Sequence, residues 1–122
     1  MQPVSLNQFV AFFFHAGGRI GRREYALGLG FIYALSLAVL TFVLIRMSDQ
    51  PPVVALLFLQ VPLTVALLVL MAKRCHDLGL PGSFVLLVLV PIAGIVWRVA
   101  LAFLSGNAGA NAYGMPPAFR PE

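Results

Sequence analysis

Charge and cysteine are both scarce in this chain of 122 residues, and each shortage excludes a class of protein. Only 10% of the residues are charged, whereas a soluble domain carries about 25%. A soluble chain with so little charge would expose large apolar patches, which monomers avoid. Cys75 is the single cysteine, so no internal disulfide can form and a disulfide-stabilised secreted fold is excluded.

Hydrophobic residues take the place of the missing charge. They make up 61% of the chain, and the mean hydropathy is +0.96. Three apolar runs are long enough to cross a hydrocarbon layer of about 30 Å at a rise of about 1.5 Å per residue. We therefore predict a single all-α membrane domain. Its predicted parts are transmembrane helices at 25–45, 53–72 and 84–104 and a loop tail at 105–122, within a domain that spans 1–122.

A short amphipathic helix, predicted at 5–15, precedes the first of these runs. Ser5 and Gln8 have the spacing of a capping box, and apolar residues follow at helical intervals as far as Phe13. Because this helix is too short to cross a bilayer, we expect it to lie in the headgroup plane with its apolar face down. A helix packed on the protein itself fits the same pattern.

Most basic residues stand at the ends of the apolar runs. Arg19, Arg22 and Arg23, here called the basic collar, precede the first run, and Lys73–Asp77, the polar knot, follows the second. The positive-inside rule places both segments on the cytoplasmic side, with the weakly charged turn at 46–52 outside. Without a stripe of basic and aromatic residues, the net charge of +4 indicates attraction to anionic lipid rather than to nucleic acid.

The direction of the third run decides where the tail lies. A full crossing of residues 84–104 leaves the C-terminus periplasmic, and we favour it because the two halves of the run are short. Pro91 and Gly94 interrupt the run, so a segment that dips into the membrane and returns is the alternative. With a full crossing, Gln60 and Arg98 lie at similar depths, and we expect their side chains to approach each other.

The polar knot is the densest group of chemically active residues. Asp77 can pair with Arg74 or Lys73 at helical spacing, and a neighbouring carboxylate can orient His76 and tune its affinity for a proton. One histidine and one aspartate are too few for a structural metal, so we predict no metal and no cofactor. We expect Glu24 to pair with an arginine of the collar or of the knot.

Three stretches of the chain together carry a family pattern. They are Gly18-Arg19 with Arg22 and Glu24-Tyr25; Arg74, His76, Asp77 and Gly79; and Gly106, Gly109, Asn111, Tyr113, Gly114 and Pro117. In this order they resemble a bacterial inner-membrane family known as domain of unknown function 805. Ala26, Ser83 and Phe84 stand where the family has tryptophans. The resemblance implies a multi-pass protein of the bacterial inner membrane and supplies no activity or cofactor.

Three functions remain open at this point. We favour a non-enzymatic membrane protein in which collar and knot meet through ion pairs and the remaining arginines bind anionic lipid headgroups. An enzyme acting on a lipid headgroup is the second, with His76 as proton carrier and Asp77 as its orienter. The third is a transporter or channel subunit, which needs oligomers because three spans are few. The candidate ligand-binding residues are Arg19, Arg22, Arg23, Glu24, Arg74, His76, Asp77 and Asn111. A homo-oligomer or a membrane-protein partner is compatible with each function.

Overall fold

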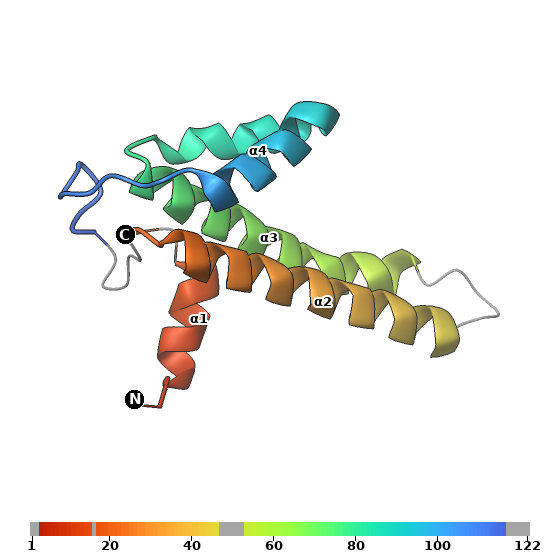
Figure 1. Cartoon of the computed structure of the whole chain (residues 1–122). Coiled ribbons are helices and arrows are strands. Elements are labelled where there is room, and N and C mark those ends of the chain that lie inside the picture. Colours follow the sequence, from red (N-terminus) through yellow and green to blue (C-terminus); the bar gives the residue numbers. More distant parts are fainter. Residues whose placement is uncertain (1–2, 16, 47–52, 117–122) are drawn as a thin grey trace.

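The computed structural model describes residues 3–15, 17–46 and 53–116, and these form five helices and no strand (Figure 1). The helices are α1 (Leu6–Phe14), α2 (Arg22–Arg46), α3 (Val53–Asp77), the 3-10 helix η1 (Gly82–Leu89) and α4 (Pro91–Phe103). The long helices α2 and α3 lie side by side in opposite directions, and α1 projects away from the start of α2. Helices η1 and α4 pack on the half of α3 that ends at the polar knot.

The first helix begins as the sequence predicts. The Gln8 amide donates to Ser5 Oγ at 3.2 Å, and the Ser5 amide donates to Gln8 Oε1 at 3.0 Å. These reciprocal bonds satisfy two amides that lack partners within the helix, and they confirm the predicted capping box.

The two long helices extend past the predicted bounds into the neighbouring polar segments. Helix α2 begins at Arg22, and α3 continues through the whole polar knot to Asp77. Gly79 ends α3 because its φ of 76° is readily adopted only by glycine. The Leu80 amide then donates to the Cys75 carbonyl at 2.9 Å, which closes a Schellman motif.

The prediction of one continuous helix over 84–104 is wrong. Helix η1 stops at Leu89, Val90 is extended, and Pro91 occupies the first turn of α4, where its missing amide costs nothing. Helix α4 then runs back along η1 (Figure 1). Gly94 permits this hairpin, because a Cβ there would lie 2.9 Å from Val88 Cα. The chain therefore returns to the end of α3, and the predicted position of the tail at the opposite end from the basic collar is also wrong.

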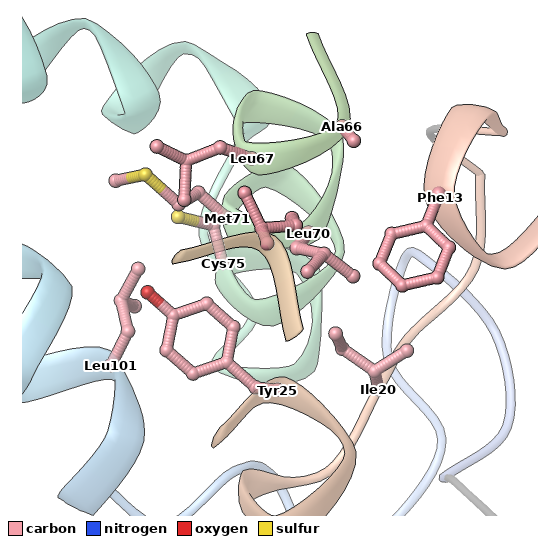
Figure 2. Packing of buried hydrophobic residues seen from close by; sticks show 10 residues of the cluster. Phe13, Ile20, Tyr25, Ala66, Leu67, Leu70, Met71, Cys75 and Leu101 are labelled. Carbon is pink, nitrogen blue, oxygen red and sulfur yellow. The ribbon is translucent and has the colours of Figure 1, made fainter. Parts of the chain in front are cut away.

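The hydrophobic core lies at the end of the molecule where α3 finishes. Tyr25 of α2, Leu70, Met71 and Cys75 of α3 and Leu101 of α4 are all fully buried there. Figure 2 shows these side chains gathered around α3, with Phe13 of α1 at the opposite side of the cluster from Leu101. The distant halves of α2 and α3 contribute little to the core and leave large apolar side chains exposed, among them Ile45 and Phe58.

The contact between Gln60 and Arg98 that the sequence predicts is not found among the described residues. No hydrogen bond joins the two side chains in the part of the chain that the structure describes. Arg98 Nη1 instead donates to the Tyr33 hydroxyl at 3.0 Å, and Gln60 lines a cavity of about 240 Å³ together with Tyr33. The predicted outer turn at 46–52, apart from Arg46, and the tail beyond residue 116 lie outside the described residues.

Candidate functional site

The polar side chains converge at one end of the helices, where three segments distant in sequence meet. These are the basic collar before α2, the polar knot at the end of α3, and the tail that follows α4. The hairpin of η1 and α4 brings the tail to this end, and the extension of α3 carries the knot there. The described residues of the three stretches of the family pattern therefore lie together at this end.

Asp77 is the centre of this site and is fully buried. Its Oδ1 accepts hydrogen bonds from Arg19 Nε at 3.0 Å and from Arg19 Nη2 at 2.9 Å. Its Oδ2 accepts from Arg74 Nη1, and Arg74 is also fully buried. A paired arrangement of this kind offsets the cost of removing the three charges from water, which would be large for any one of them alone. We call Arg19, Asp77 and Arg74 the Arg–Asp–Arg clamp.

Backbone carbonyls bind the rest of the Arg74 guanidinium group. Nε donates to the Leu101 carbonyl at 2.7 Å, Nη2 donates to the Leu104 carbonyl, and Nη1 donates to the Ile20 carbonyl at 3.3 Å. The carbonyls of Leu101 and Leu104 belong to the last turn of α4 and its cap, where helix carbonyls lack partners of their own. Arg74 thus caps α4 and joins it to α3 and to the collar.

Arg19 fastens the tail in the same way. Its guanidinium group donates to the carbonyls of Asn107 at 2.6 Å, Gly109 at 2.8 Å and Gly114 at 3.1 Å. The Asn107 amide donates back to the Asp77 carbonyl at 2.8 Å. Between residues 105 and 116 the tail has no helix, and these hydrogen bonds connect it to Arg19 and to the end of α3.

His76 lies beside the clamp and does not pair with Asp77. Its Nδ1 lies 3.1 Å from the Gly18 carbonyl, and its ring stacks on Tyr113 with the centroids 4.1 Å apart and the planes at 6°. Asn111 Nδ2 donates to the His76 carbonyl at 2.9 Å. The carboxylate that the enzyme hypothesis assigns to His76 is therefore bound by two guanidinium groups instead.

The other predicted residues separate into different environments. Arg22 Nη1 donates to the Phe103 carbonyl at 3.2 Å, whereas Arg23 is exposed and has no hydrogen bond or ion pair with any described residue. Lys73 is buried and donates to the carbonyls of Ala11 and Phe12 at the end of α1. Glu24 differs from its prediction: among the described residues it pairs with no arginine, and its Oε2 is buried without a partner.

The clamp holds the collar, the end of α3, the end of α4 and the tail together. Among the residues that the structure describes, no three histidine, cysteine, aspartate or glutamate side chains are grouped closely enough to hold a metal ion. Sequence reasoning missed the stack of Tyr113 on His76 and the binding of Lys73 to α1. The aromatic residue within the Gly/Asn-rich tail was a signal for the first, and nothing in the sequence pointed to the second.

The fold and the site define a small all-helical protein with two long apolar helices and a buried Arg–Asp–Arg clamp at one end. The family model described as protein of unknown function (DUF805) matches residues 13–115, and the chain belongs to this family. The match includes the collar, the knot and the tail as far as Met115, so all three clamp residues lie within it. No curated protein and no solved structure matches the chain.

Proposed function

We propose that this chain is an integral protein of the bacterial inner membrane. Helices α2 and α3 are each 25 residues long, and their most apolar stretches have mean hydropathies of 2.3 and 2.7. Only 17% and 11% of those stretches are buried within the protein. Core helices of a soluble protein would be mostly buried, so the exposure favours a lipid environment for both helices.

In this proposal α2 and α3 cross the bilayer, while η1 and α4 enter it and return. The tip of the hairpin carries Leu89 and Ile92, which are 76% and 79% exposed, as suits a tip that lies in hydrocarbon. The positive-inside rule puts the clamp end in the cytoplasm, because Arg46 is the only basic residue that the structure describes at the opposite end of α2 and α3. Helix α1 lies at the headgroup level, where Leu6 and Val10 meet lipid.

The function that this arrangement supports best is non-enzymatic binding of anionic lipid headgroups beside a structural clamp. The observation that carries it is the contrast between the arginines. Arg19 and Arg74 are occupied by Asp77 and by carbonyls, whereas Arg23 is exposed and Arg22 makes one bond through Nη1. A guanidinium group binds a phosphate through two parallel hydrogen bonds, so Arg22 and Arg23 are suited to lipid phosphate at the cytoplasmic face.

Native mass spectrometry of the detergent-purified protein with added phosphatidylglycerol tests this function. The variant Arg22→Gln/Arg23→Gln should retain less of this lipid, because each basic residue near the surface contributes about 1 kcal/mol, or roughly fivefold. Arg46→Gln, at the opposite end of α2, is the matched control and should lose much less. Equal retention by the double variant and the unsubstituted protein would contradict the proposal.

A further inference from the structure

A cavity of about 620 Å³ lies between α1 and the first turns of α2, near the clamp end of the molecule. Its walls are largely aromatic, with Phe9, Phe13 and Phe31 in mutual ring contact at centroid distances of 5.1–6.0 Å. Leu27, which is 65% exposed, stands at its edge. The contacts of Phe9 and Phe13 with Phe31 join α1 to α2, and the three rings give the cavity an apolar wall.

Among the described residues that line this cavity, Glu24 is the one with a charge. Its Oε2 is buried and has no hydrogen-bond partner among the described residues. Lys73 Nζ, the ammonium group that contacts the end of α1, donates to the carbonyls of Ala11 and Phe12 and lies over the Phe12 ring. A carboxylate oxygen removed from water without a partner is costly, so a cationic donor would be stabilised here.

We propose that this cavity binds a zwitterionic aminophospholipid, with the primary ammonium group of the lipid on Glu24. The inference rests on the proposed function, which places this face at the headgroup level of a membrane. An acyl chain fills the aromatic cavity, the ammonium donates to the free carboxylate oxygen of Glu24, and Arg23, the preceding residue, is exposed to take the phosphate. The lipid thus supplies both charges that the protein leaves unpaired at this position.

The chemistry distinguishes this lipid from its relatives. A primary ammonium has three N–H donors, whereas the trimethylammonium of a choline lipid has none and cannot bond to Glu24. A lipid with only an anionic headgroup gains from the arginines but is repelled by the Glu24 carboxylate. The cavity should therefore prefer phosphatidylethanolamine to phosphatidylcholine, with the N-monomethyl and N,N-dimethyl lipids in between.

Competition between phosphatidylethanolamine and phosphatidylcholine for the purified full-length protein, read by native mass spectrometry, tests the inference. The unsubstituted protein should prefer the ethanolamine lipid roughly tenfold, the ratio expected for one hydrogen bond to a charged group. Glu24→Gln should abolish the preference, and Glu24→Asp should keep part of it. The inference is overturned if the unsubstituted protein shows no preference or if Glu24→Gln retains it.

Two further variants separate this inference from the proposed function. Leu27→Trp fills the edge of the cavity from an exposed position and should reduce retention of both competing lipids; unchanged retention would contradict binding in the cavity. Glu24→Gln should leave retention of phosphatidylglycerol intact or raise it, because Arg22 and Arg23 remain. If Glu24→Gln loses phosphatidylglycerol, the assigned role of Glu24 as a partner of the lipid ammonium is wrong. If Arg22→Gln/Arg23→Gln retains as much phosphatidylglycerol as the unsubstituted protein, only the proposed function is contradicted.

Discussion

Arg19 donates two hydrogen bonds to the carboxylate of Asp77, a residue 58 positions further along the chain, and the exposed fractions of their side chains are 0% and 1%. A buried ion pair over this sequence distance fixes how the segment before α2 meets the end of α3. Arg74 binds the same carboxylate and also donates to the end of α4. Asp77 therefore connects the collar, the end of α3 and, through Arg74, the end of α4.

Replacement of this aspartate should be strongly destabilising. Asp77→Asn leaves two buried guanidinium groups without their anion, and loss of one partner of a buried pair costs about 3–5 kcal/mol. Cys75, the single cysteine, is fully buried, so its reaction with a thiol reagent during denaturation in detergent reports unfolding.

Glu24→Gln is the matched control. It removes a carboxylate charge from the same end of the molecule, but Glu24 forms no ion pair with any described residue. We expect it to change the free energy of unfolding by less than about 0.5 kcal/mol. Similar effects of the two substitutions would contradict the central role of Asp77.

The stack of His76 on Tyr113 should hold the tail in place. His76→Ala removes it and should cost about 0.5–1.5 kcal/mol, with faster amide hydrogen exchange across residues 105–116. His76→Phe keeps an aromatic ring and should preserve most of the protection. Equal exchange in His76→Ala and the unsubstituted protein would show that the stack does not secure the tail.

The turn after α3 should not tolerate a side chain. Gly79→Ala forces a left-handed conformation on alanine, at about 1–2 kcal/mol, and brings its Cβ to 2.6 Å from Asn107 Nδ2. In the double variant with Asn107→Ala, the steric part of the loss should be recovered while the conformational part remains. Denaturation midpoints of the four proteins measure both parts, and a fully additive loss would contradict the predicted clash.

The sequence predicts the parts of this fold that depend on local pattern. The capping box of Ser5 and Gln8 and the long apolar runs of α2 and α3 follow from residue spacing and from length. That the collar and the knot meet also followed, from the placement of arginines at the ends of apolar runs. The capping box depends on residues close in sequence. The gathering of collar and knot at one end depends on the cost of placing charged side chains within an apolar run.

The hairpin was harder to predict because its decisive contacts are tertiary. Pro91 and Gly94 mark the break in the sequence, but the length of each half of the run favours a full crossing. A 3-10 helix rises about 2.0 Å per residue against about 1.5 Å for an α-helix, so η1 reaches further than its eight residues suggest. The pairing of Glu24 was also missed: its side chain lines the cavity between α1 and α2 and bonds to no described arginine.

We propose that the N-terminal helix and the tail lie on one side of a membrane, where the Arg–Asp–Arg clamp joins the tail to the collar that follows this helix. Single cysteines at exposed positions test it most directly: Asn7→Cys in α1, Ala108→Cys in the tail and Val53→Cys at the far end of α3, with the buried Cys75 as an unreactive background. With a membrane-impermeant thiol reagent, the cysteines at positions 7 and 108 should react in inverted vesicles, and the cysteine at position 53 should react in intact spheroplasts. Labelling of position 108 from the same side as position 53 would contradict it.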